Sequence, residues 1–358
     1  WDLSALYASF DDPKFHSDLT AVQAQVAEFH DAYRGTVTAL AQSTPEAIAQ
    51  ALTELETIYR VVDYLYSYPS LVFAADTADT AAQQAMDKMQ KALTVVQNDL
   101  LFFELELQTL DEAVIQTLKQ QSSLASYGHY LQNIGKFAPY RLDEAVEQVR
   151  NQDNLTGRRA FIQLRSEHIS QQTYEPVTGS DESVAETEAD LSALLFQGNG
   201  DIRYQAYQSV RAVSQTHNSL YTYILSAIAQ VHATENKLRG YGSTLNKQLL
   251  GDEVPADVFG ALMNGTNSRF DLWQRYYKLK AGAIGDTIRT CDVYAPWDAE
   301  PTAISYDQGV DILLDALSKF DEVYAGRASE FFTQNLVDAR VRPTKRGGTD
   351  GQARHKPL

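Results

Sequence analysis

The stretch 201–236 constrains this chain most strongly. Its side chains repeat at steps of three or four residues, which is the spacing of one face of an α-helix. The stripe consists of Ile202, Ala206, Val210, Val213, His217, Leu220, Ile224, Ile228 and Val231. Because no proline interrupts the stretch, we predict one continuous helix of roughly 54 Å. A stripe of that length has to be covered by other helices, since it would otherwise face water.

The ends of this stretch carry residues that begin and end helices. At the start, Asn199 or Asp201 can accept hydrogen bonds from free N–H groups. At the other end, Lys237 and Arg239 place positive charge at the negative end of the helix dipole. Gly240 follows and permits a left-handed exit. The sequence therefore predicts that the helix ends within 237–242.

Most of the remaining chain repeats the helical spacing in shorter units. The predicted helices cover 17–40, 43–67, 77–108, 111–120, 122–135, 141–151, 156–170, 255–279, 307–320 and 322–336. Pro69 is expected to end the second of them, and Met86 and Met89 are expected to fill the core from the third. Consecutive helices with short links predict an antiparallel bundle at the N-terminus, so we expect a mainly α fold.

The helical spacing changes near 173–186. Residues 173–178 read as a strand, 179–181 as a turn and 183–185 as a short return strand. We therefore predict a small β-ribbon here. It separates the N-terminal bundle from the long helix, which places a domain boundary near Gly198.

Composition limits the classes of partner and compartment. The 358 residues include 47 acidic and 30 basic side chains, a net charge of −17. A surface this acidic repels nucleic-acid phosphates and anionic membranes, and no apolar run is long enough to span a bilayer. A single cysteine, Cys291, excludes an intrachain disulfide and fits a reducing compartment. With no signal peptide visible, we expect a cytoplasmic protein.

Local catalytic motifs are missing. Helical zinc proteases use His-Glu-x-x-His, which places two imidazoles and a glutamate around the metal and its water. None of the seven histidines is followed by glutamate, and no two lie three or four residues apart. We therefore assign no catalytic residue and no metal ligand, and we expect Cys291 to be a buried or neutral thiol.

Five segments, in order and spacing, resemble the oligoendopeptidase F branch of zinc metallopeptidases, relatives of thimet oligopeptidase. They are Trp1-Asp2-Leu3-Ser4-x-Leu6-Tyr7, Tyr33-Arg34-Gly35, Asn236–Tyr241, Arg275–Ala281, and Val337–Ala339 through Lys345–Gly348. The resemblance implies an N-terminal helical domain, 1–198, and the first part of a helical metallopeptidase domain, 199–348. It also implies a deep channel that admits short unfolded peptides, and zinc that activates water beside the motif glutamate.

The resemblance stops at the decisive place. In that branch the Lys-Arg-Gly-Gly segment is followed by an apolar strand and the His-Glu-x-x-His helix, whereas here the tail 349–358 has neither. We therefore expect a truncated or frame-shifted form that is inactive alone and binds no zinc. Arg239 and Tyr241 are the candidates for contacting a peptide, since a guanidinium and a phenol can bind carbonyls or a terminal carboxylate. Capping the long helix and fixing its exit is the equally weighted alternative for both.

Two other functions stay open. The chain could be a stand-alone helical module that binds peptides or a protein partner without catalysis. It could also be a complete helical enzyme whose residues come from distant segments. A stand-alone protein should unfold cooperatively with its apolar faces covered, whereas a truncated one should expose a large apolar surface.

Overall fold

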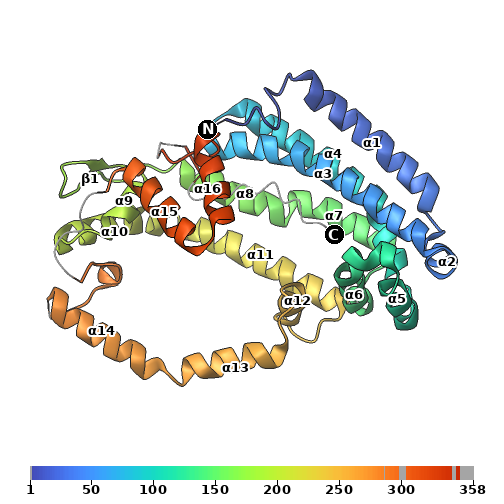
Figure 1. Cartoon of the computed structure of the whole chain (residues 1–358). Helices are drawn as coiled ribbons and strands as arrows, with labels where there is room; N and C mark the ends of the chain where they lie inside the picture. The colour runs from blue at the N-terminus through green and yellow to red at the C-terminus, as the bar shows by residue number, and fades with distance from the viewer. Residues whose placement is uncertain (1, 286, 298–303, 341–343, 347–358) are drawn as a thin grey trace. The chain divides into compact units, whose positions relative to one another are not determined.

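The computed structural model describes residues 2–285, 287–297, 304–340 and 344–346, and they are mainly helical (Figure 1). Contacts divide the chain into two compact units. Of the described residues, unit 1 comprises 2–5, 167–222 and 260–346, and unit 2 comprises 6–166 and 223–259. Each unit is described by itself.

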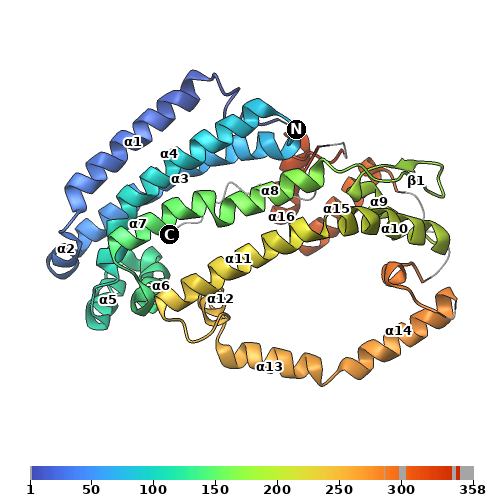
Figure 2. The same cartoon turned by 180° about the vertical axis from the view of Figure 1, so that it is seen from behind.

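Unit 2 is a helical bundle. Its elements are α1 (Pro13–Tyr33), α2 (Val37–Ser43), α3 (Pro45–Ala75), α4 (Thr80–Leu107), α5 (Glu112–Lys119), η1 (Ser122–Tyr127), α6 (Gly128–Phe137), η2 (Ala138–Tyr140), α7 (Glu144–Thr156) and α12 (Asn246–Gly251). The long helices α1, α3 and α4 lie side by side, joined by short links (Figures 1 and 2). The predicted antiparallel bundle is confirmed.

Aromatic rings and aliphatic side chains form the core of this bundle. Phe103 is completely buried, and its ring centroid lies 5.3 Å from that of Phe29 on α1. Met86 and Met89 are buried on α4, as predicted. The apolar stripe of each long helix thus faces its neighbours, because that arrangement removes the most apolar surface from water.

Two helix ends in unit 2 differ from the prediction. Pro69 does not end a helix, since α3 continues to Ala75. Leu65 and Phe73 are buried on either side of the proline, so packing outweighs the hydrogen bond that proline removes. The helix predicted over 17–40 is divided into α1 and α2, because Gly35 adopts a φ of 76° that a helix cannot continue.

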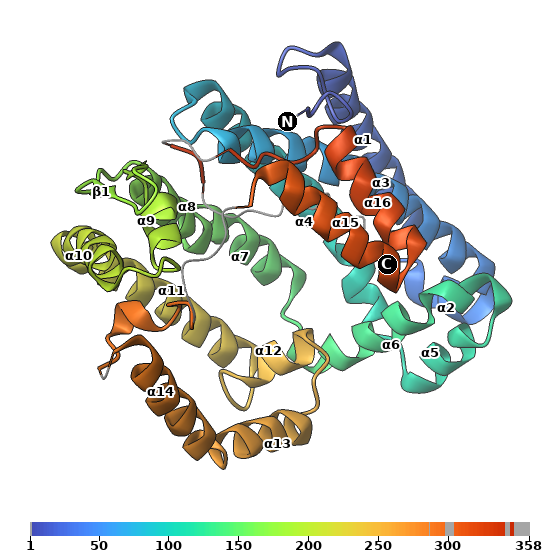
Figure 3. The same ribbon diagram turned by 60° about the vertical axis from the view of Figure 1, so that its left-hand side comes forward.

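Unit 1 contains the β-ribbon and the C-terminal helices. Its elements are β1 (Val177–Thr178), β2 (Val184–Ala185), α9 (Glu188–Leu194), α10 (Gly200–Thr216), α14 (Phe270–Ile284), η3 (Thr290–Asp292), α15 (Tyr306–Phe320) and α16 (Glu322–Thr333). The ribbon is antiparallel, with Val177 opposite Ala185, and is confirmed. It packs with α9 against Ala206 of α10, and α15 and α16 form a helical hairpin (Figure 3).

The long helix predicted over 201–236 is wrong as a single element. It is divided into α10 and α11 (Asn218–Arg239), and His217 stands between them with φ −103° and ψ 13°. The predicted ends are confirmed: the Asn199 side chain accepts hydrogen bonds at the start of α10, and Gly240 has a φ of 74°. The spacing of the apolar stripe could not reveal the break, because His217 fits the helical spacing whether the helix continues or breaks there.

One further predicted helix is divided, and the boundaries between the two units fall inside helices. The helix predicted over 255–279 is divided into α13 (Ala256–Asn267) and α14. The chain passes from one unit to the other within α8 (Arg158–Ser170), α11 and α13. The domain boundary predicted near Gly198 falls inside unit 1 and stays a prediction. The tail 349–358 lies outside the described residues.

Among the described helices, none combines the length and apolar character needed to cross a membrane.

Candidate functional site

Arg239, the last residue of α11, is held by oxygen atoms from three elements of unit 2. Its terminal nitrogens pair with both carboxylate oxygens of Glu147, at 2.6 and 2.7 Å. Its Nε donates to Glu235 one turn earlier at 3.2 Å, and Nη1 also donates to the carbonyl of Tyr140 at 3.2 Å. The side chain is only 17% exposed. These contacts fasten the end of α11 to α7 and η2.

Tyr241 lies beside the contacts of Arg239 because its ring packs on that of Tyr140. The two rings are stacked, with centroids 4.1 Å apart and an angle of 16° between planes. Burial raises the pKa of the Tyr241 phenol, so it remains a neutral hydrogen-bonding group at physiological pH. The structure thus places both predicted binding residues around Tyr140. Contact of either with a peptide stays a prediction, whereas their role in fixing the exit of α11 has direct contacts.

A further carboxylate, that of Glu104, lies next to this cluster. Glu104 on α4 is exposed. Its pKa is nevertheless raised, first by desolvation from the surrounding protein atoms and then by the charge of Glu147. Gln108 donates a hydrogen bond to it at 3.0 Å. Burial and the charge of Glu104 raise the pKa of Tyr59 to about 12. Glu104 was missed because nothing local in the sequence shows that α4, α7 and α11 bring their carboxylates together.

Replacing Arg239 with lysine is expected to lower the free energy of unfolding by about 1–3 kcal/mol. A lysine ammonium cannot pair with both Glu147 oxygens and also reach the Tyr140 carbonyl, so buried acceptors lose their donors. Urea unfolding followed by circular dichroism measures the change. Lys237→Arg, at an exposed position on the same helix, is the control and should change nothing measurable. Equal midpoints and slopes for both variants would contradict the role given to Arg239.

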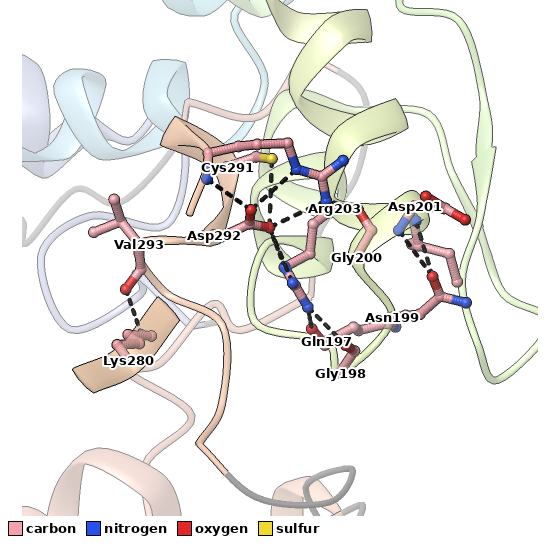
Figure 4. Close-up of polar contacts among 12 residues, drawn as sticks. Gln197, Gly198, Asn199, Gly200, Asp201, Arg203, Lys280, Cys291, Asp292 and Val293 are labelled. Atoms are coloured by element: carbon pink, nitrogen blue, oxygen red, sulfur yellow. Dashed lines mark hydrogen bonds and ion pairs between the residues drawn. The ribbon is translucent and has the colours of Figure 1, made fainter. Parts of the chain in front are cut away.

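A second polar cluster lies in unit 1 and is shown in Figure 4. Arg203 on α10 and Asp292 at the end of η3 are 3% and 2% exposed. The guanidinium donates through Nε to Asp292 Oδ1 at 3.0 Å, and through Nη1 to the carbonyls of Gln197 and Gly198, each at 2.7 Å. This buried ion pair ties η3 to the start of α10.

The same aspartate is held from its own loop. The Nε of Arg289 and its backbone N–H donate to Asp292 Oδ2, at 3.0 and 2.9 Å. Burial acts to raise the pKa of Asp292, but the hydrogen bonds from Arg289 and Arg203 outweigh it and hold the pKa at about 2. Cys291 is buried, as expected, and burial and the adjacent Asp292 raise the pKa of its thiol. The cluster holds the fold together and supplies no nucleophile.

Metal binding finds no support in the described residues. Within 2–285, 287–297, 304–340 and 344–346, no three histidine, cysteine or carboxylate side chains lie together in a group that could hold a metal ion. A catalytic zinc needs three protein ligands and an open position. The described residues therefore do not fit a zinc centre, and the prediction that this chain binds no zinc continues to rest on the missing motif.

Comparison with known proteins identifies relatives along nearly the whole chain. The family described as Oligopeptidase F matches residues 106–174. Group B oligopeptidase PepB of Streptococcus agalactiae is 24% identical, covering 97% of this chain and 57% of that protein. Oligopeptidase PepF of Bacillus subtilis is 22% identical and is covered to 52%. The chain thus spans little more than half the length of these curated relatives.

Solved structures show the same fold. Oligoendopeptidase F from Enterococcus faecium superimposes with a TM-score of 0.71 at 17% identity, covering 92% of this chain and 68% of that one. A putative peptidase from Chlamydophila abortus gives 0.59 at 21% identity, covering 97% and 58%. The similarity in sequence extends over 97% of this chain, in agreement with the resemblance of its motifs. This chain is therefore similar in sequence and fold to the oligoendopeptidase F peptidases and spans only part of their length.

Proposed function

We propose that this chain is the N-terminal portion of an oligoendopeptidase F-like zinc metallopeptidase of the cytoplasm that hydrolyses short unfolded peptides. In this proposal the chain supplies helical wall and does not cleave peptides by itself. The observation that carries it is the match to 97% of this chain but only 57% of a relative named as an oligopeptidase. The missing His-Glu-x-x-His motif belongs, by resemblance, to the unmatched part.

Exposed apolar side chains on the C-terminal helices support this proposal. In unit 1, Leu279 on α14 is 67% exposed, Phe320 at the end of α15 is 78% exposed, and Val323 on α16 is 63% exposed. Further exposed apolar residues on these helices are Phe270, Leu272, Trp273, Tyr276, Ile312, Leu313, Tyr324 and Phe331. Monomeric proteins rarely leave so much apolar surface in water, so additional polypeptide is expected to cover it.

Of the two residues proposed to contact a peptide, Tyr241 is the better candidate. Most donors of the Arg239 guanidinium are taken by Glu147, Glu235 and the Tyr140 carbonyl. A peptide would have to displace one of them, which leaves a buried acceptor without a donor. The phenol of Tyr241 can donate to a peptide carbonyl without breaking the ion pair. We therefore assign Arg239 to positioning Tyr140 and Tyr241, and Tyr241 to contact with the peptide.

Complementation tests the proposal. The chain is produced alone and together with the portion of Streptococcus agalactiae PepB that lies beyond the matched region, and cleavage of a short quenched peptide is measured with and without chelator. We expect each part alone to be inactive and the two together to show chelator-sensitive cleavage. Tight stoichiometric zinc in this chain alone, with chelator-sensitive cleavage, would overturn the proposal.

A binding control separates failed assembly from a wrong assignment. The isolated chain should bind a hydrophobic dye, and Phe320→Lys with Leu279→Lys should reduce that binding. Val95→Lys, at an exposed position on α4 of unit 2, is the matched control. A cooperative melt without dye binding would instead favour the stand-alone binding module.

A further inference from the structure

Two histidines meet where α10 gives way to α11. His168 lies in the last turn of α8, and its ring centroid is 4.5 Å from that of His217, with the planes at 79°. Tyr221 in the first turn of α11 places its hydroxyl 3.1 Å from His168 Nδ1. All three residues belong to unit 1 and are half-buried.

The contacts of Nδ1 favour one neutral form of His168. The side-chain nitrogen of Gln172 donates to the His168 carbonyl at 2.6 Å and lies 3.3 Å from Nδ1 of the same residue. An amide nitrogen can only donate, so this contact is a hydrogen bond when Nδ1 accepts. A neutral His168 with its proton on Nε2 satisfies both contacts, because the Gln172 amide and the Tyr221 hydroxyl can then donate to Nδ1.

Protonation of His168 would disturb this arrangement. A proton on Nδ1 would point at the Gln172 nitrogen, whose lone pair is delocalised into the amide and accepts no hydrogen bond, and which is held in place by the His168 carbonyl. The new charge would also lie beside the His217 ring. In agreement, burial and then His217 lower the pKa of His168. The other ionisable groups near this cluster are Glu167, which precedes His168 on α8, and Tyr174, which interacts with Tyr221 and hydrogen-bonds Glu188.

We propose that His168 and His217 form a proton-sensitive latch, which holds the break between α10 and α11 at neutral pH and releases it in mild acid. The latch joins the two ends of the segment Glu167–Thr222, because His168 and Tyr221 each lie one residue inside an end. The backbone bond that it secures runs from the Tyr221 N–H to the His217 carbonyl at 3.1 Å.

The direction of the pH effect follows from proton linkage. A histidine whose pKa is lowered on folding binds its proton first in the unfolded or opened state. Its contribution to stability is therefore complete above the ordinary histidine pKa of about 6.5. That contribution is lost as the pH falls below this value and through the lowered pKa of the folded state. The opening of the latch should follow the same pH range.

Nuclear magnetic resonance titration of the histidine ring protons tests the latch in the unmodified chain. We expect His168 to titrate below the ordinary histidine value, and to move upward in His217→Gln and in Tyr221→Phe. These two variants remove the neighbouring imidazole ring and one hydrogen-bond partner of Nδ1, respectively. Titration of His168 at or above the ordinary value would overturn the proposal.

Hydrogen exchange tests the structural consequence. Protection of the amides of residues 217–221, corrected for intrinsic exchange, should fall severalfold between about pH 7.5 and about pH 5.5. His168→Gln, which cannot gain a charge, should abolish this pH dependence, while His16→Gln at an exposed position on α1 should keep it. Constant protection in the unmodified chain, or the same loss in His168→Gln, would contradict the latch.

Discussion

Replacing Arg203 with methionine is expected to lower the free energy of unfolding by about 3–5 kcal/mol. Methionine fills much of the volume but removes the charge that faces Asp292, which is 2% exposed. Breaking a buried ion pair from one side has a cost of this order, and Asp292 would keep the more exposed Arg289 but lose its buried guanidinium partner. The carbonyls of Gln197 and Gly198 lose their donor as well. Urea unfolding followed by circular dichroism measures the loss.

The control for this prediction is on the same helix. Arg211→Met removes an exposed arginine from α10 and should change the stability by no more than about 0.5 kcal/mol. If Arg203→Met and Arg211→Met unfolded at the same urea concentration, the Arg203–Asp292 pair would not hold η3 to α10. A second variant, Arg289→Met, should cost less than Arg203→Met, since the Arg289 side chain is 39% exposed.

Phe103→Ala should lower the free energy of unfolding of the bundle by about 3–5 kcal/mol, the usual cost of removing a buried phenylalanine. Phe103 is completely buried, and its ring meets those of Phe29, Tyr33 and Phe102 at centroid distances of 5.3 to 6.3 Å. Edge-to-face contacts of this kind add to the lost burial. Scanning calorimetry provides the measurement as a lowered transition temperature.

Val95→Ala is the comparison variant for the bundle. Val95 lies on α4, as Phe103 does, but is 56% exposed, so its truncation should cost about 0.5 kcal/mol or less. Phe103→Leu should fall between the two and keeps the chain folded if alanine proves too disruptive. Equal transition temperatures for Phe103→Leu and Val95→Ala would show that the ring cluster does not stabilise the bundle.

Local signals in the sequence explain the correct predictions. The ends of α10 and α11 were predicted because Asn199 and Gly240 act through their own backbone neighbourhood. The β-ribbon was predicted because alternation and a turn lie within a few residues of each other. The motif resemblance was likewise confirmed by relatives that cover 97% of the chain.

Packing between distant segments explains the wrong predictions and the residues that were missed. Pro69 carries a strong local stop signal, but buried neighbours on both sides keep α3 helical. The break at His217 accompanies its contact with His168 from another helix. Arg203 and Asp292 are 89 residues apart, and neither position carries a local sign of the other.

The sequence by itself determined the mainly helical class, the apolar stripes and most helix ends, because these depend on spacing and on residues within one turn of each other. Only the tertiary structure decided where helices break or continue, and which carboxylates face which cations. The physical reason is that burial changes both the cost of a backbone defect and the strength of a charge pair. Burial at a given residue is set by segments far away in the chain.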